Sequence, residues 1–176
     1  MQKLLTSSIV RKFIPFRKST SRKGQNGIVM VLGGSYIYHG APILSSIAAL
    51  RSGTDLVYTC VPKINVEATR SVSPNLIVIP LVDQKLTRGA VNKLLGVLPK
   101  NLDSATIGMG LSIQDRNSLL LLVKSLIDQD TRLSLDASAL IPEVLPVLHD
   151  KNVVLTPHAG EFSRSEEHTS ELQSPC

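Results

Sequence analysis

The chain has few aromatic residues and few cysteines. Among 176 residues there are three Phe, three Tyr and no Trp, so the core has to be built from Ile, Val, Leu and Ala. The two cysteines, Cys60 and Cys176, are distant in sequence and provide neither a disulfide framework nor metal-site spacing. No apolar run approaches the roughly 18 residues that a membrane span needs. No long apolar segment followed by a small-residue cleavage site marks a signal peptide. These absences predict a soluble, cytoplasmic protein without a membrane partner.

Acidic residues are missing from the first 23 positions, which hold seven Lys or Arg. Residues 24–163 carry eleven basic and eleven acidic residues, so the formal net charge of +5 originates in this N-terminal arm, 1–23. Four apolar residues are interleaved with its charges: Ile9, Phe13, Ile14 and Phe16. This pattern favours a short amphipathic helix docked on the domain over a nucleic-acid-binding arm. We therefore expect no nucleic-acid partner.

From residue 28 onward, short apolar runs alternate with helical patterns. Strands are expected over 28–32, 55–61, 75–80, 104–108, 132–135 and 152–156. Helices are expected over 42–51, 64–70, 87–98, 115–127 and 139–148, the last broken by two prolines. Such alternation is typical of βαβ units with a parallel sheet. The length suits one domain with a real core, which we place at 24–163.

Parallel sheets bind ligands beyond the carboxyl ends of their strands. Five segments follow expected strand ends: 33–40, 61–63, 108–112, 136–138 and 156–161. In the first, Gly33 and Gly34 open a loop that leads to Ala41 and Pro42 at a helix start. Such a corner favours anionic ligands, because backbone N–H groups and the helix dipole point into it. Its spacing is not that of the G-x-G-x-x-G dinucleotide fingerprint.

Two further loops each allow two interpretations. Gly108 and Gly110 would let the backbone approach a flat or phosphorylated ligand, or they only satisfy a turn with positive φ. Asp136 is placed to contact a metal or a ribose, or to cap the helix that follows. Ser138 could provide that cap instead.

The last predicted strand leads into a loop that holds His158 and Glu161. The histidine could bind a ligand hydroxyl or phosphate, or move a proton. Alternatively, it caps a helix start, with Glu161 facing the dipole from the first turn. The chain lacks a nucleophile elbow, an HExxH motif and a cysteine pair, so no metal site is expected.

The aliphatic pattern stops after Phe162. Residues 164–174 match the translation of a widely used sequencing-library adapter over eleven consecutive positions. We interpret 164–176 as a non-native tail, although an ordinary polar tail is the alternative. His168 and Cys176 then have no function, and the original protein would have been longer.

Six segments together resemble one family, in this order: Lys23–Gly27, Gly33–Pro42, Ala49–Leu56, Ile107–Leu111, Leu135–Leu140 and Val154–Phe162. The chain resembles the NAD(P)H-hydrate dehydratase family, the YjeF carboxy-terminal domain of the ribokinase-like superfamily, with an archaeal look. The resemblance covers about 5–163, and its GGS-x-x-Y-x-GAP and TPH-x-GEF elements are specific. It implies the N-terminal portion of a three-layer α/β/α ribokinase-like domain with a mostly parallel sheet.

The resemblance also implies a reaction on damaged nicotinamide cofactors. Family members phosphorylate the hydroxyl of the hydrates NADHX and NADPHX with ADP, or ATP in eukaryotes, and we expect Mg²⁺ to accompany the nucleotide. Loss of phosphate then restores NADH or NADPH. The implied substrate contacts are Ala41, Gly110 and His158. Additional loop contacts are expected from Gly33, Gly34, Gly108, Asp136 and Glu161.

Two departures from the family pattern bear on activity. Ser138 stands where many members have aspartate. The family's Lys-Gly nucleotide loop and its Gly-rich loop ending in Gly-Asp, which supplies the candidate base, have no counterpart in 1–163. We therefore expect no catalytic residue in this chain and an inactive fragment. The archaeal look favours ADP as the phosphoryl donor, and we expect the full-length protein to be a homo-oligomer. The alternatives are a ribokinase-like sugar or vitamin kinase and a non-catalytic nucleotide-binding half-domain.

Overall fold

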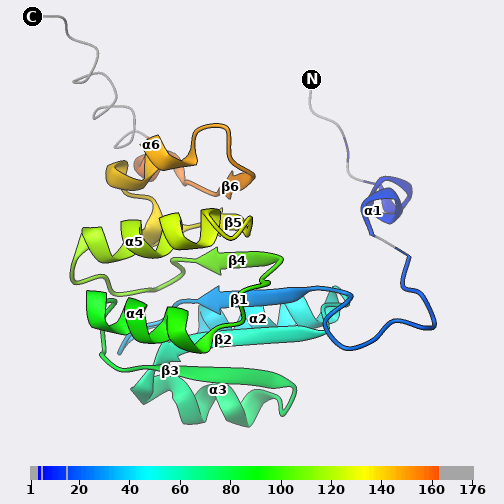
Figure 1. Cartoon of the computed structure of the whole chain (residues 1–176), viewed down its shortest axis with the longest axis horizontal. Coiled ribbons are helices and arrows are strands. Elements are labelled where there is room, and N and C mark those ends of the chain that lie inside the picture. Colours follow the sequence, from blue (N-terminus) through cyan, green and yellow to red (C-terminus); the bar gives the residue numbers. More distant parts are fainter. Residues whose placement is uncertain (1–3, 5, 15, 163–176) are drawn as a thin grey trace, which may run out of the picture.

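Six strands form one parallel sheet in the order β3-β2-β1-β4-β5-β6 (Figure 1). The computed structural model describes residues 4, 6–14 and 16–162, and the tail assigned to 164–176 lies outside them. The strands are β1 (Ile28–Leu32), β2 (Leu56–Pro62), β3 (Leu76–Leu81), β4 (Ser104–Ile107), β5 (Arg132–Leu135) and β6 (Val153–Leu155). All six were expected from their apolar runs, within one residue at each end.

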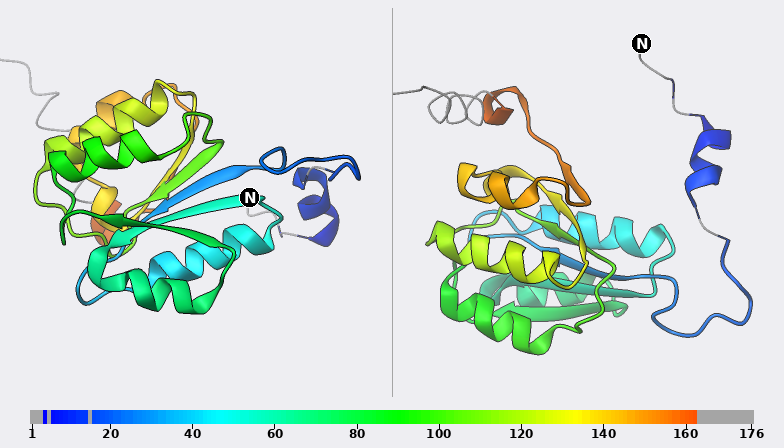
Figure 2. Two further views of the ribbon diagram at one scale, coloured as in Figure 1. Left: turned by 60° about the horizontal axis from the view of Figure 1, so that its bottom comes forward. Right: turned by 45° about the horizontal axis from the view of Figure 1, so that its top comes forward.

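Helices connect these strands. The α-helices are α1 (Ser7–Phe13), α2 (Gly40–Arg51), α3 (Val66–Val72), α4 (Arg88–Val97), α5 (Arg116–Ile127) and α6 (Leu145–Leu148). Three 3₁₀ turns accompany them: η1 (Lys63–Asn65), η2 (Ala137–Ala139) and η3 (Pro142–Val144). The α2 and α3 helices cover one face of the sheet, and α4, α5 and α6 cover the other (Figure 2). The predicted three-layer α/β/α architecture is confirmed.

The central strand β1 explains how the two faces are filled. Met30 and Leu32 belong to the larger apolar cluster, together with buried residues of α4 and α5. Val31 points to the other face and joins the smaller cluster with Val57. Alternate side chains of a strand face opposite sides, so a strand covered by helices on both faces is apolar throughout.

The order of the strands creates a switch point in the sheet. β1 pairs with β2 on one side and with β4 on the other, and Leu32 is opposite both Cys60 and Ile107. The chain first moves outward from β1 to β3, then returns to place β4 beside β1. In open α/β sheets, ligands bind at this point, outside the carboxyl ends of the strands.

Helix boundaries follow their caps. Thr87 Oγ1 accepts the Ala90 N–H ahead of α4, and Asp115 Oδ1 accepts the Asn117 N–H ahead of α5. Both residues were expected inside their helices, but a capping residue has extended backbone and lies just outside the first turn.

The helix expected over 139–148, broken by two prolines, is indeed interrupted. The segment forms η2, η3 and α6 in succession. Pro142 and Pro146 each occupy a first or second helical position, which proline tolerates because it has no N–H to leave unpaired. Each proline therefore starts a short turn and prevents the preceding one from continuing.

The N-terminal arm forms the expected helix α1, but the predicted docking on the domain is wrong. Figures 1 and 2 show α1 lying apart from the sheet, and Ile14 and Phe16 are 58% and 91% exposed. Both faces of the sheet are already covered by other helices, so α1 has no apolar surface there to pack on. Among the described residues, no helix is long and apolar enough to cross a membrane.

Candidate functional site

The loops after β1 and β4 interlock at the switch point. Gly34 donates its N–H to the Met109 carbonyl at 2.9 Å. A Cβ on Gly33 would lie 2.6 Å from that same oxygen, and one on Gly110 would lie 2.7 Å from Tyr38 Cβ. A side chain at either glycine would therefore push the two loops apart.

The β5 loop packs equally closely against Gly108. This glycine has a φ of +122°, and a Cβ there would lie 1.9 Å from the Asp136 carbonyl oxygen. Its N–H donates to Leu32 O, while the Gly33 N–H donates to Cys60 O. Gly33, Gly34 and Gly108 thus use their N–H groups inside the protein. They shape the floor of the site, and ligand contact by them stays a prediction.

The connection from β1 to α2 projects from this floor. Tyr36, Ile37 and Tyr38 are all exposed, and Ala41 lies in the exposed first turn of α2. The residue before the helix, His39, makes no side-chain cap bond, and the N–H groups of Gly40 and Ala41 in the first turn of α2 have no intrahelical partners. This end of α2 retains the anion-attracting character that the sequence predicts.

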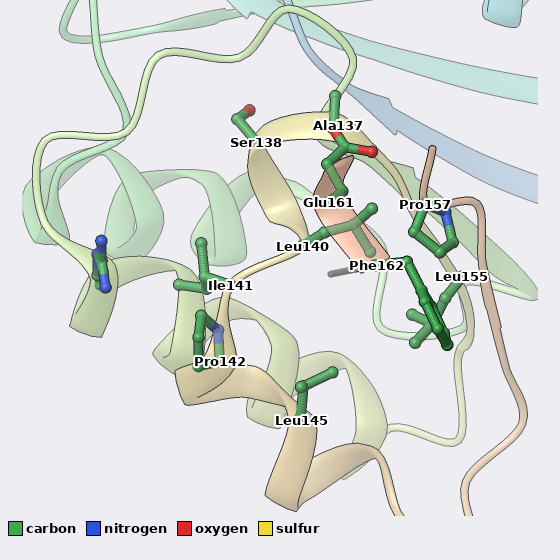
Figure 3. A pocket seen from close by; sticks show the side chains of 11 residues that line it. Ala137, Ser138, Leu140, Ile141, Pro142, Leu145, Leu155, Pro157, Glu161 and Phe162 are labelled. Carbon is green, nitrogen blue, oxygen red and sulfur yellow. The ribbon is translucent and has the colours of Figure 1, made fainter. Parts of the chain in front are cut away.

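Two cavities line the carboxyl edge of the sheet. One of 450 Å³ lies over the glycine loops and is lined by Tyr38, Gly110 and Ser138. The second, of 560 Å³, lies between the η2–α6 segment and the residues after β6, where Ser138, Leu145 and Glu161 surround it (Figure 3). Because Ala137 and Ser138 line both, the two cavities adjoin each other.

Neither Asp136 nor Ser138 caps the turn that follows through its side chain, so that alternative is wrong. The Ser138 hydroxyl lies 2.8 Å from Gly108 O and 2.7 Å from Leu111 O, and so ties the β5 loop to the β4 loop. The Asp136 carboxylate accepts the Thr156 hydroxyl at 2.8 Å. A carboxylate at position 138 could not donate to these two carbonyls.

His158 and Glu161 form a reciprocal helix cap. The Glu161 carboxylate accepts the His158 N–H at 2.9 Å, and His158 Nδ1 accepts the N–H groups of Gly160 and Glu161. Since Nδ1 is an acceptor, the neutral ring carries its proton on Nε2, which lies 3.3 Å from Glu161 Oε1. His158 therefore caps the helical turn, as one of the two interpretations predicted. Its side chain is 69% exposed, so a ligand could still reach it.

The predicted contacts divide into two groups along the edge. Tyr38 brings the Ala41 segment against Gly110, whereas His158 follows β6. β1 and β6 are separated by three strand spacings of about 4.8 Å, or about 14 Å. Only an extended ligand could contact both groups at once.

The described residues of this region offer neither a reactive thiol nor a metal-binding cluster. Burial raises the pKa of the Cys60 thiol, which therefore stays protonated. Among the residues that the structure describes, no three His, Cys, Asp or Glu side chains gather in a way that could hold a metal ion.

Asn65 was missed by sequence reasoning. It ends η1 and is 4% exposed, and its Nδ2 donates to the Ser35 carbonyl at 2.9 Å. A single asparagine between two short helical turns belongs to no motif. Its contact with Ser35 becomes apparent only in the structure, where β2 pairs with β1 and the loops after the two strands lie together.

Known proteins resemble this chain in both sequence and structure. The family model described as NAD(P)H-hydrate dehydratase matches residues 29–174. The ADP-dependent (S)-NAD(P)H-hydrate dehydratase of Nitrosopumilus maritimus is 82% identical over 163 residues, covering 93% of this chain and 57% of the relative. The corresponding enzyme of Cenarchaeum symbiosum is 66% identical over 155 residues, covering 88% and 54%. The chain thus spans about half the length of these curated relatives.

Solved structures agree with the sequence matches. The ADP/ATP-dependent NAD(P)H-hydrate dehydratase of Bacillus subtilis, co-crystallized with ATP/Mg²⁺, is 28% identical with a TM-score of 0.72, covering 92% of this chain and 55% of that one. A ribokinase-like superfamily protein of Enterococcus faecalis is 25% identical with a TM-score of 0.72, covering 97% and 58%. The chain belongs to the NAD(P)H-hydrate dehydratase family.

Proposed function

We propose that the whole protein is an ADP-dependent (S)-NAD(P)H-hydrate dehydratase that returns NADHX and NADPHX to NADH and NADPH. The observation that carries this proposal is the 82% identity to the Nitrosopumilus maritimus enzyme over 163 residues. ADP would phosphorylate the hydrate hydroxyl, and loss of phosphate would restore the double bond of the nicotinamide ring. The sugar or vitamin kinase alternative has less support, because these relatives are named dehydratases.

The described residues would bind and orient the hydrate. The N–H groups at the start of α2, near Ala41, suit an anionic part of the dinucleotide. Gly110 allows close approach over the 450 Å³ cavity. The exposed His158 side chain follows β6, two strands beyond β4 and the Gly110 loop, and could bind a more distant part of an extended ligand.

Phosphoryl transfer itself needs a positioned nucleotide and neutralised charge. Mg²⁺ bound with ADP would supply that neutralisation, whereas the described residues form no metal site of their own. We propose that domain 24–163 binds the hydrate without turnover on its own, and that 164–176 is non-native. We also propose that the complete enzyme acts in the cytoplasm as a homo-oligomer.

The test is an assay of the coding sequence continued to the length of its relatives. ADP with hydrated NADH should produce a rise in the absorbance of reduced nicotinamide, and this rise should require ADP. The present chain is the control that should bind the hydrate without producing the rise. No rise with either ADP or ATP would contradict the proposed function.

His158 can be tested separately in the full-length enzyme. His158→Ala removes the exposed imidazole, so we expect hydrate affinity to fall about tenfold, the equivalent of about 1.4 kcal/mol. Loss of the cap should also lower the free energy of unfolding by about 1 kcal/mol. The matched control is His149→Ala, which removes an exposed histidine paired with Asp150 ahead of β6. Equal affinities of the two variants would leave His158 with its capping role alone.

A further inference from the structure

Asn65 links two neighbouring βα units. It follows β2, and its buried side chain reaches the loop that follows β1, where Nδ2 donates to Ser35 O at 2.9 Å. Its own backbone is held by Thr69, whose hydroxyl donates to the Asn65 carbonyl at 2.7 Å. Asn65 therefore approaches the loop from a fixed base in η1 and α3.

Ser35 is the point where this loop turns. Its N–H donates to Tyr38 O at 2.8 Å, and its hydroxyl accepts the Tyr38 N–H at 3.3 Å. Asn65 binds the remaining carbonyl, so all three polar groups of Ser35 are engaged. Ser35 is itself buried, and its carbonyl would lose a partner that water does not readily replace.

The loop is held from two sides at the preceding residue. The Gly34 N–H is bound to Met109 O on the β4 side, and a Cβ on Gly34 would lie 3.0 Å from Asn65 Nδ2 on the β2 side. Tyr38, three residues after Ser35, packs directly against Gly110. The contact between the β1 and β4 loops at Gly110 thus depends on the Ser35 turn that Asn65 holds.

We propose that Asn65 is a positioning residue for the hydrate substrate. It lines neither of the two cavities at the candidate ligand edge, and it acts by fixing the Ser35 turn and hence the distance between the first turn of α2 and Gly110. This inference rests on the proposed dehydratase function. If Asn65 had a purely structural role, its substitution would lower stability without changing the affinity for substrate.

The test compares Asn65→Leu with Ser118→Ala in the full-length enzyme. Asn65→Leu keeps the branched shape of the side chain but removes the donor to Ser35. Ser118→Ala removes the hydrogen bond of another buried side chain, from the Ser118 hydroxyl to Asp115 Oδ2 in α5, without removing any contact to Asn65 or to the loop. We expect Asn65→Leu to raise the KM for the hydrate about tenfold while the KM for ADP stays unchanged. Ser118→Ala should leave both KM values unchanged, although both variants lower the thermal midpoint.

Amide hydrogen exchange provides a readout that does not need activity. Asn65→Leu should accelerate exchange at residues 34–38 by about tenfold, and Ser118→Ala should not. If the unmodified full-length enzyme shows no ADP-dependent turnover, the proposed function fails, and exchange still decides whether Asn65 holds the loop. An unchanged hydrate KM in an active enzyme, or unchanged exchange at 34–38, would overturn the role of Asn65.

Discussion

Gly108 and Gly96 differ in what an added methyl group would meet. At Gly108, with a φ of +122°, a Cβ would lie 1.9 Å from the Asp136 carbonyl oxygen and 2.7 Å from Ala139 Cβ. At Gly96 in α4, it would meet nothing within 4 Å. The same substitution therefore has opposite expected effects at the two positions.

We expect Gly108→Ala to lower the free energy of unfolding by about 3 kcal/mol or more, because it combines backbone strain with a backbone clash. Gly96→Ala should raise it by about 0.5–1 kcal/mol, because alanine loses less conformational freedom in a helix. Urea unfolding of both variants measures the difference. A Gly108→Ala variant as stable as the parent would mean that the β4 and β5 loops are less closely packed than described.

Asp55 organises the opposite end of the sheet. Its carboxylate accepts the N–H groups of Gly24 and Asn26 and the Asn26 amide, and it pairs with Arg17 at 2.6 Å. The backbone bond from Asn26 contributes most to holding the pKa of Asp55 below its usual value, with the Asn26 side chain and Arg17 adding to it against the effect of burial.

A lowered pKa in the folded state makes a pH-dependent contribution to stability. The ionised form is favoured by folding, so the contribution is present above the unfolded value of about 3.9 and is lost as pH falls through the lower folded value. Asp55→Asn should therefore be less stable than the parent at pH about 7, with a difference that shrinks below pH about 4. Urea unfolding at both pH values checks this, and a constant difference would contradict it.

Among the elements, α1 and α5 show that the pattern of apolar residues in a helix does not by itself predict whether the helix packs on the sheet. Both contain apolar residues among polar ones. In α5, Leu119, Leu122 and Leu126 are fully buried against the sheet. Around α1, Val10, Ile14 and Phe16 remain exposed because no face of the sheet is free for them.

Substitutions in these two elements should differ accordingly. Leu122→Ala should lower the free energy of unfolding by about 2–5 kcal/mol, because it leaves a cavity in the core. Phe16→Ser, at a side chain that is 91% exposed, should change it by no more than about 0.5 kcal/mol. A large loss from Phe16→Ser in this chain would show that the arm docks on the domain after all.

The existence of elements was predictable, whereas their contacts were less so. β1, β2, β3 and β6 are short, largely apolar runs, and β4 and β5 alternate polar and apolar residues, so local sequence predicts where each strand lies. The order β3-β2-β1-β4-β5-β6 depends on the point at which the chain reverses direction across the sheet. No local sequence pattern predicts that point.

The same distinction applies to the candidate site. Gly110 and His158 were predicted as contacts because they lie in motifs after strand ends, and ligand contact by them stays a prediction. Asn65 was not predicted, because its proposed role depends on one hydrogen bond to Ser35, in the loop after a neighbouring strand. The role of Ser138 between two carbonyls was also hidden, since in sequence it competes with Asp136 as a helix cap.

In the molecule as a whole, β6 forms one edge of the described sheet. Val154 in this strand is 60% exposed, Leu155 is 38% exposed, and Phe162 beyond it is 52% exposed. An exposed apolar edge strand pairs readily with other chains, and charged residues on the edge oppose this.

We expect this chain to self-associate with rising concentration and Val154→Lys to reduce the association. The control is Val97→Lys at the end of α4, because Val97 is similarly exposed at 58% but is not in a strand. Light scattering over a concentration series measures both. Equal suppression by the two variants would point to net charge, and no suppression by Val154→Lys would exclude the β6 edge.

The switch point has a consequence for how the protein is made. Pairing of β1 with β2 joins segments only a few tens of residues apart, but β1 also needs β4, which starts at Ser104. During synthesis, the Gly34 N–H therefore lacks its Met109 partner until 109 residues have been produced. Contacts this distant in sequence form slowly. The ligand edge therefore forms on the ribosome only after β1, β2 and β3 have emerged.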